Sequence, residues 1–227
     1  MTHKLIGVVG LIGAGKDTVA DYLVNLHHFR RDSFAASLKD AVAHVFGWDR
    51  ILLEGRTKQA REWREKIDNW WADRLNMPNL TPRLVLQLWG TEVCRKGFHD
   101  SIWIASLENK LRNIKDNVVI SDCRFPNEIK SIKNAGGIVI RVVRGPDPIW
   151  YDDALTCNAG PSHSKWAVAK TRMIEYNIHD SETAWVGTKF DAVIDNNGSF
   201  SSLFLQIDNL INDQVPDLRV STESQTA

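Results

Sequence analysis

The sequence lacks an excess of charge of either sign. Among its 227 residues, lysine and arginine together number 28, and so do aspartate and glutamate. A chain without net charge has no overall field that draws it toward nucleic acid or an anionic membrane. We therefore expect no stable binding to either, and any site for a polyanion has to be built locally.

Cysteine is scarce, and long apolar runs are absent. The three cysteines, Cys94, Cys123 and Cys157, fit neither a disulfide framework nor the spacing of a zinc site, which favours a reducing compartment. No stretch approaches the roughly 20 apolar residues of a membrane span, and the first residues do not resemble a signal peptide. We expect a soluble, unprocessed, cytoplasmic protein.

Short apolar runs rich in β-branched residues alternate with helical patterns. The runs predict buried parallel strands at 4–10, 117–122, 137–144 and 190–195, with a weaker fifth at 30–34. Helical periodicity predicts helices at 15–28, 37–46, 58–75, 82–96, 100–114, 126–135 and 200–212. This alternation predicts an α/β fold with a doubly wound, five-stranded parallel sheet and right-handed crossovers.

Two stretches interrupt the alternation. Residues 48–97 carry helical patterns without a strand, so we interpret them as a helical insertion. Residues 145–188 are rich in Gly, Pro, Asp, His and Ser, with one short helical pattern near 165–177, and indicate either a lid or a long surface loop. The predicted remainder is a core of 1–47, 98–144 and 189–215, followed by a flexible tail at 216–227.

Within the insertion, apolar residues recur at helical spacing. They are Trp63, Ile67, Trp70, Trp71 and Leu75, at i, i+4, i+7, i+8 and i+12. One helix face is therefore expected to be apolar and rich in tryptophan. We interpret this face as a packing surface rather than a platform on which bases stack.

A glycine-rich stretch, GLIGAGKDT at 10–18, lies between the first predicted strand and the first predicted helix. Its glycines let successive backbone N–H groups point into one concavity at a helix N-terminus, which favours an anion. Lys16 would then reach the β- and γ-phosphates of a nucleoside triphosphate. The pattern predicts a phosphate cradle formed by Gly10, Gly13, Ala14, Gly15, Lys16, Asp17 and Thr18.

Asp17 departs from this pattern, which normally has serine or threonine after the lysine to contact Mg²⁺. A carboxylate there could bind the metal directly, act through water, or point away as an acid in the first turn of the helix. The sequence is equally compatible with Asp17 as part of the metal shell and with Asp17 as an acid at the end of the helix. Thr18 is a candidate to supply the missing hydroxyl.

Polar residues follow two other predicted strands, at the edge where ligands bind in such sheets. Asp122 ends one strand, where an acid can hold Mg²⁺, and Arg124 comes two residues later. A structural ion pair between these two is the alternative. Arg144 ends the next strand, where its permanent charge could stabilise a phosphoryl group in transfer.

A polar stripe is predicted on the helix that begins at TPRLVLQLWGTEVCR (81–95). Thr81 is a favourable N-cap and Pro82 a favourable first residue, which fixes the helical phase. Arg83, Gln87, Gly90 and Thr91 then share one face, with Arg95 at its edge and Gly90 leaving a gap for close approach. We interpret this face as a reader of base and phosphate rather than a solvated surface.

These features together predict a small-molecule kinase: a cradle for the donor triphosphate, a polar groove for the acceptor in the insertion, and a lid that excludes water. Two alternatives remain. One is another small-metabolite kinase, such as dephospho-coenzyme A kinase, which shares the loop and the sheet. The other is a nucleotide-dependent switch or nucleic-acid-binding ATPase, although the basic stretch at 55–66 is interleaved with Glu62 and Glu65.

The motifs occur in an order that resembles the deoxynucleoside monophosphate kinases of tailed bacteriophages. The matching segments are GKDT (15–18), LKDA (38–41), the pattern PRxxLQLxGTExxR (82–95), DSIW (100–103), SDxRFPNE (121–128), the arginine at 144, HxSE (179–182) and DxxIxNxGS (191–199). They span most of the chain. Residues 150–166 match no part of this pattern.

The resemblance implies a P-loop nucleoside monophosphate kinase fold, ATP and Mg²⁺ as donor and cofactor, and conversion of deoxynucleoside monophosphates (dNMP) to diphosphates for phage DNA synthesis. It also implies a homodimer, and the host cytoplasm as the location of a phage-encoded chain. Lys16 would serve the phosphates, Asp122 the metal, and Arg124 and Arg144 the transferred group. For the acceptor nucleotide it implies Lys39, Arg83, Gln87, Thr91, Arg95 and Arg124. It leaves open whether His179 and Glu182 brace the lid or contact substrate.

Overall fold

The computed structural model describes residues 4–213, so the predicted tail at 216–227 lies outside the described residues. The chain forms two compact units. We call residues 4–31 and 116–213 the sheet unit, and residues 32–115 the helical unit. The helical unit is larger than the predicted insertion at 48–97, because it also includes segments that the sequence pattern assigned to the core.

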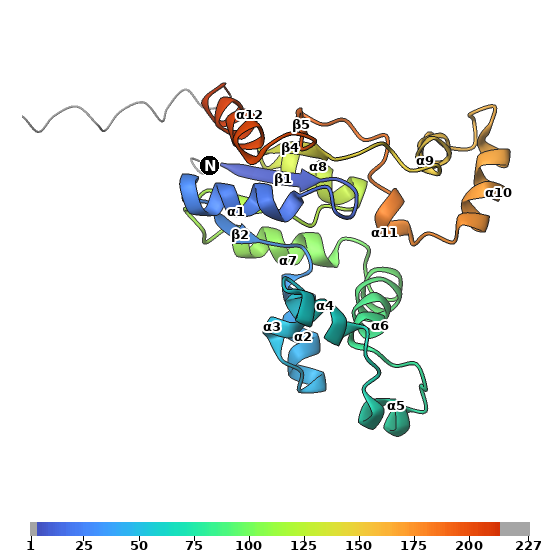
Figure 1. The fold of residues 1–227 in the computed structure, drawn as a ribbon. Helices are drawn as coiled ribbons and strands as arrows, with labels where there is room; N and C mark the ends of the chain where they lie inside the picture. The colour runs from blue at the N-terminus through green and yellow to red at the C-terminus, as the bar shows by residue number, and fades with distance from the viewer. Residues whose placement is uncertain (1–3, 214–227) are drawn as a thin grey trace, which may run out of the picture. The chain divides into compact units, whose positions relative to one another are not determined.

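The sheet has five strands in the order β2-β3-β1-β4-β5 (Figure 1). They are β1 (Leu5–Val9), β2 (Arg30–Asp32), β3 (Val118–Ile120), β4 (Ile138–Val143) and β5 (Ala192–Asp195). The pairs β1–β3, β1–β4 and β4–β5 are parallel. Each predicted strand is present, and the doubly wound sheet is confirmed. Since the strands run the same way, the residues after β1, β3 and β4 meet at one edge.

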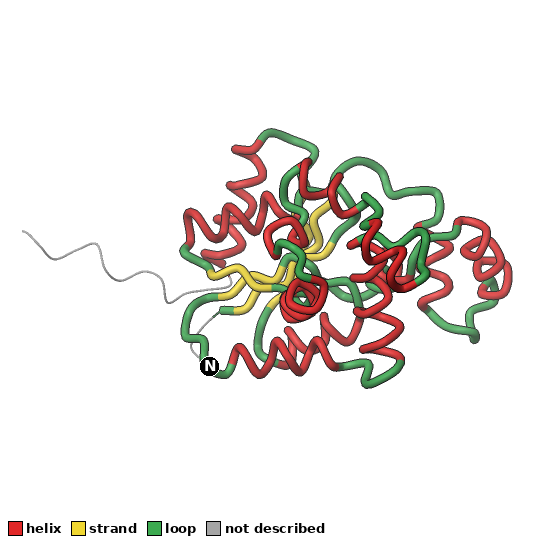
Figure 2. Tube along the Cα trace, turned by 90° about the horizontal axis from the view of Figure 1, so that it is seen from below, coloured by secondary structure: helices red, strands yellow, loops and turns green. Residues whose placement is uncertain are grey.

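Helices of the sheet unit cover both faces of the sheet, whose strands are yellow in Figure 2. The helices are α1 (Lys16–His27), α8 (Pro126–Asn134), α9 (Tyr151–Asn158), α10 (Trp166–Tyr176), α11 (Asp180–Thr183) and α12 (Phe200–Asp213). Ile6 and Val8 pack in one cluster with residues of α1 and α12. Between them, Gly7 faces the other way, where an added Cβ would lie 2.5 Å from Ile132 of α8. For residues 145–188 the sequence indicates one short helix, whereas the structure has three, α9, α10 and α11.

The helical unit packs around aromatic side chains. Its elements are α2 (Ala36–Phe46), α3 (Arg50–Glu54), α4 (Lys58–Arg64), α5 (Asn69–Leu75), α6 (Pro82–Gln87), the π-helix η1 (Leu88–Lys96) and α7 (Ile102–Leu111). Phe46 is at the centre, with its ring 4.5 Å from Trp48, 4.7 Å from Trp71 and 5.6 Å from Trp89 between centroids. Among residues 4–213, no helix is long and apolar enough to cross a membrane.

The single helix predicted at 58–75 is wrong. Two short helices occupy this stretch, because the side chain of Asp68 accepts a hydrogen bond from the backbone of Trp71 at 3.2 Å and starts α5 anew. The predicted apolar stripe is therefore split. Trp63 and Trp71 pack against the core, as expected for a packing surface, whereas Ile67, Trp70 and Leu75 are 47%, 64% and 46% exposed.

The helix predicted at 82–96 is present but changes its pitch. Thr81 caps it through the backbone of Leu84 at 3.1 Å, and Pro82 is at the first turn, both as predicted. From Leu88 onward it is a π-helix, and at its end the Gly97 N–H bonds to the Glu92 carbonyl at 3.0 Å, five residues back. The α-helical phase that placed Arg83, Gln87, Gly90 and Thr91 on one stripe is therefore lost after Gln87.

Candidate functional site

The phosphate loop connects β1 to the N-terminus of α1. Gly13 and Gly15 have φ of +79° and +99°, which side chains with a Cβ rarely adopt. The Nδ2 group of Asn196, which follows β5, donates to the Ala14 carbonyl at 2.8 Å and braces the loop. Asn196 belongs to the segment 191–199, but the sequence pattern gave it no role. The loop therefore has the glycine-dependent backbone that an anion cradle requires.

Lys16 lies over its own loop. Its Nζ donates to the Gly10 carbonyl at 2.9 Å and to the Leu11 carbonyl at 2.8 Å. Burial lowers the pKa of Lys16, and the nearby Arg124 guanidinium lowers it further, while Glu182 and Asp17 oppose that shift. The charges of Lys16, Arg124 and Glu182 thus act on one another across α1, the β3 edge and α11.

Arg124 contacts the lid-like region. Its Nη1 donates to Glu182 Oε1 at 2.5 Å and to Ser181 Oγ at 3.2 Å. The buried carboxylate of Glu128 accepts from the backbone N–H groups of Arg124 and Phe125 at 2.8 and 3.1 Å, which fixes the turn after β3. The sequence left open whether Glu182 braces the lid or contacts substrate. In the structure its carboxylate is paired with Arg124, a residue of the predicted site.

Asp17 contacts Arg31 of β2, a partner that the sequence did not indicate. The same guanidinium donates to Asp21 Oδ1 at 2.7 Å and to Ser121 Oγ at 2.8 Å. Ser121 directly precedes Asp122, so this arginine connects the first turns of α1 with the end of β3. The metal and helix-end roles of Asp17 stay predictions.

Arg144 and Arg141 differ in their surroundings: Arg141 lies within β4, and Arg144 directly follows it. Arg144 is exposed directly after the strand. Arg141 donates to Asp147 Oδ1 at 2.6 Å, and its guanidinium lies 4.8 Å from the ring centre of Tyr151 and 5.4 Å from that of Trp185. Arg141 thus contacts the segment that follows β4, whereas Arg144 is exposed.

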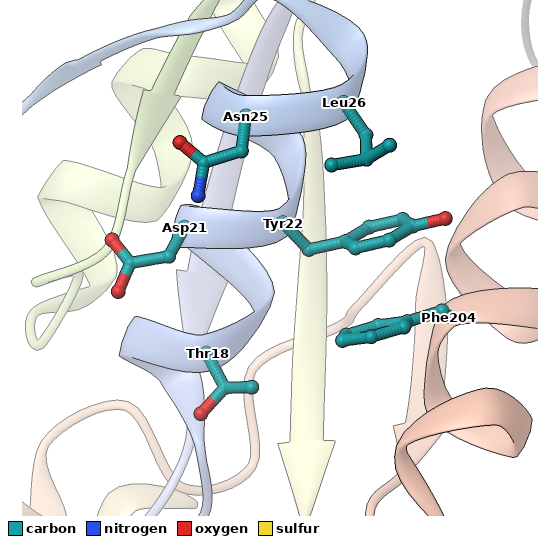
Figure 3. Close-up of a pocket in the computed structure, with 6 residues that line it drawn as sticks. All are labelled: Thr18, Asp21, Tyr22, Asn25, Leu26 and Phe204. Carbon is teal, nitrogen blue, oxygen red and sulfur yellow. The ribbon is translucent and has the colours of Figure 1, made fainter.

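An open groove of about 510 Å³ lies between α1 and α12 (Figure 3). Tyr22 and Leu26 reach toward α12, where the Phe204 ring stacks on Tyr22 with 4.0 Å between centroids. Thr18 also lines this groove. No other residue of the loop at 10–18 does, so the groove lies along the flank of α1 and meets the predicted cradle only at Thr18.

The predicted acceptor residues all lie in the helical unit, apart from Arg124. Three of them form ion pairs: Lys39 with Glu54 at 2.8 Å, Arg83 with Glu65 at 3.0 Å, and Arg95 with Asp100 at 3.0 Å. Arg95 is buried, whereas Gln87 is exposed and Thr91 is half-buried. Lys39, Arg83 and Arg95 are therefore each paired with a carboxylate.

The gap predicted at Gly90 is filled by the protein itself. An added Cβ would lie 2.8 Å from a methyl group of Leu38 in α2, and the Trp103 Nε1 group donates to the Gly90 carbonyl at 2.9 Å. The close approach predicted at Gly90 is made by Leu38 of the protein itself. Its small size is explained by close helix packing.

The residues at this edge fit a magnesium-bound triphosphate. Among the described residues, no group of three or more His, Cys, Asp or Glu could hold a metal by itself. Mg²⁺ ordinarily takes one or two carboxylates and completes its shell with phosphate oxygens and water. Asp122, next to the phosphate loop across the β1–β3 pair, provides a carboxylate of this kind.

No protein-family profile matches the chain. A protein of Acanthamoeba polyphaga mimivirus described as a deoxynucleotide monophosphate kinase is 34% identical over 154 residues, which covers 62% of this chain and 74% of that protein. The chain belongs to the deoxynucleoside monophosphate kinase family. The deoxynucleoside-5′-monophosphate kinase of Escherichia phage T5 is 26% identical over 223 residues, with 77% of this chain and 84% of that enzyme covered.

A dephospho-CoA kinase of Trichormus variabilis is also similar to this kinase. It is 28% identical over 99 residues, which covers 37% of the chain and 50% of that enzyme. The family resemblance seen in the sequence motifs is thus confirmed, because the deoxynucleoside monophosphate kinases match over far more of the chain.

Proposed function

We propose that this kinase transfers the γ-phosphoryl group of ATP to the 5′-phosphate of a deoxynucleoside monophosphate. An oxygen of the acceptor phosphate forms a new bond to the γ-phosphorus while the bond to the β-bridging oxygen breaks, which releases ADP and the deoxynucleoside diphosphate. The glycine-built loop, with Lys16 at the N-terminus of α1, is the observation that carries this proposal. Family membership supports the choice of acceptor.

The residues of the sheet unit have separable roles in this proposal. Backbone N–H groups of the loop bind the β- and γ-phosphates, and Lys16 exchanges its two loop carbonyls for phosphate oxygens. Arg124 and Arg144 stabilise charge on the transferred group. Asp122 would hold Mg²⁺, which neutralises phosphate charge when bound.

The acceptor is proposed to bind Lys39, Arg83, Gln87, Thr91 and Arg95. Phosphate and base both suit such a set, because guanidinium and ammonium groups bind phosphate while amide and hydroxyl groups bond to base edges. The lid role of 145–188 and the homodimer stay predictions.

The alternative acceptor is dephospho-coenzyme A. Its support is the shorter match to one such kinase. The acceptors differ in chemistry, since dephospho-coenzyme A presents a ribose hydroxyl as the nucleophile, whereas a dNMP presents a phosphate oxygen. A direct comparison of acceptors therefore separates the two.

A coupled assay of ADP formation tests the proposal. We expect ADP only when ATP and Mg²⁺ are supplied together with at least one of the four dNMPs. The ribonucleotide counterparts and dephospho-coenzyme A serve as comparison acceptors. ADP formation with none of the dNMPs, or with dephospho-coenzyme A alone, would reject the proposed function.

A further inference from the structure

The carboxylate of Asp17 is an electrostatic problem for a phosphate cradle. It directly follows Lys16 in the first turn of α1, where the polyphosphate of the donor is proposed to bind. A second acid, Asp21, lies one turn later on the same helix, so two like charges are neighbours at i and i+4. Without a counter-charge, Asp17 would repel a triphosphate bound beside Lys16, whereas Asp21, one turn further along the helix, would act much more weakly.

Arg31 supplies that counter-charge from a different element. It belongs to the edge strand β2, and its side chain is only 14% exposed, compared with 77% for Asp17 and 57% for Asp21. Nη2 contacts Asp17 and Ser121 Oγ, while Nη1 donates to Asp21 Oδ1 at 2.7 Å. The Arg31 guanidinium is therefore shielded from solvent, and it contacts the carboxylates of Asp17 and Asp21 at once.

The several N–H donors of a guanidinium explain why arginine suits position 31. A guanidinium can bind two carboxylates and a hydroxyl in one plane, whereas a lysine ammonium is a single point charge on a flexible stem. The hydroxyl partner, Ser121, precedes Asp122 at the end of β3. Arg31 thus holds the start of α1 against the strand end that carries the predicted metal ligand.

We propose that Arg31 is a positioning residue for the donor nucleotide: it neutralises Asp17 and holds that carboxylate away from the phosphate cradle, so that the polyphosphate can bind. This inference rests on the proposed function only in taking the loop as a nucleotide site. It assigns Asp17 to Arg31 instead of the metal shell.

The test is a rescue experiment. Affinity for ADP without metal and for ATP with Mg²⁺ is measured by calorimetry in wild type, Arg31→Ala, Asp17→Ser, and the double variant Arg31→Ala with Asp17→Ser. We expect Arg31→Ala to weaken both nucleotides about tenfold, as for one unpaired charge near a polyphosphate. The double variant should return to within about threefold of wild type.

Asp21 provides the matched control. The double variant Arg31→Ala with Asp21→Ser removes the other carboxylate partner, one turn away from Lys16, and should stay about tenfold weak. In steady-state assays, Arg31→Ala should raise the KM for ATP and leave the KM for the acceptor unchanged. Thermal unfolding of every variant checks that the fold is kept, and Arg31→Lys, which keeps the charge, gives a milder second comparison.

Three results would overturn the inference. Arg31→Ala could bind nucleotide as wild type does, or its defect could persist when Asp17 is replaced by serine. Alternatively, Asp17→Ser alone could weaken ATP with Mg²⁺ but not metal-free ADP, which would identify Asp17 as a metal ligand. A wild type that binds nucleotide but phosphorylates no dNMP would reject the proposed function and leave this test intact.

Discussion

The candidate binding residues of the two units are arranged in different ways. In the sheet unit, the phosphate loop is built from backbone, with glycines at positive φ and Lys16 bonded to loop carbonyls. In the helical unit, Lys39, Arg83 and Arg95 are each paired with a carboxylate. If the proposed sites are right, the donor loop is formed before its ligand binds, whereas the acceptor has to compete with internal ion pairs.

The hydrophobic cores of the two units also differ in their side chains. The sheet unit has an aliphatic core, in which Ile6, Val8 and Leu23 are buried together. The helical unit has an aromatic core around Phe46, where indole N–H groups also bond: Trp71 to the Phe46 carbonyl at 3.1 Å and Trp48 to Asp68 at 2.8 Å. Its shape therefore depends on a few large side chains.

The largest expected effect concerns the backbone-built site. Lys16→Ala should lower kcat about a thousandfold, because the loop would lose the positive charge that stabilises the transferred phosphoryl group in the transition state. Steady-state kinetics measure this effect, and thermal unfolding should show an intact fold. If turnover in this variant equals that of wild type, Lys16 has no part in the cradle.

The aromatic core gives the next prediction. Phe46→Ala should destabilise the protein by about 3 kcal/mol, because a buried ring contacting three indoles is lost. Urea unfolding followed by tryptophan fluorescence measures it. Trp70→Ala is the matched control and should cost less than about 1 kcal/mol, because Trp70 is 64% exposed. Equal costs would show that Phe46 is not central.

Glu54 tests the internal ion pairs through pH. Burial opposes ionisation of Glu54, but Lys39 and Arg50 outweigh it and lower the pKa to about 2, below its ordinary value of about 4.3 in an unfolded chain. A carboxylate with a lowered pKa contributes stability above its unfolded pKa and loses it as pH falls through the folded one.

Glu54→Gln should therefore be less stable than wild type by about 1 kcal/mol at pH 6, and the two should converge as pH falls from about 4.5 to 2. Urea unfolding at several pH values measures the difference. A difference that does not change with pH would contradict an ionic role for Glu54.

The smallest effect is expected at the exposed pair between Arg83 and Glu65, whose side chains are 48% and 57% exposed. Exposed pairs contribute little, so Glu65→Gln should free Arg83 and lower the KM for the acceptor only about two- to threefold. Glu62→Gln, on the same helix, is the control. An unchanged KM would argue against competition between Glu65 and the acceptor phosphate.

Local sequence signals predicted the sheet unit well. The β-branched runs marked four of the five strands, with β2 only a weaker candidate, and the glycine spacing marked the phosphate loop, because both depend on residues adjacent in the chain. The break at Asp68 was missed because the tryptophan spacing continues the helical period across it. The π-helix from Leu88 onward was missed because the sequence pattern was interpreted with the ordinary α-helical period.

Long-range partners could not be predicted. Arg31 meets Asp17 only because β2 is next to β3 in the sheet, and Asn196 braces the loop only because β5 ends near it. Neither neighbour follows from sequence spacing. The same holds for Glu182 and Arg124, which are 58 residues apart in the chain.

The central claim is that the loop at 10–18 delivers the γ-phosphoryl group of ATP to a deoxynucleotide phosphate. The most direct measurement uses ATP radiolabelled at the γ-phosphate, mixed with wild type and each dNMP in turn. The account predicts label in a deoxynucleoside diphosphate and little in inorganic phosphate. Label released only as inorganic phosphate, whichever dNMP is present, would contradict it.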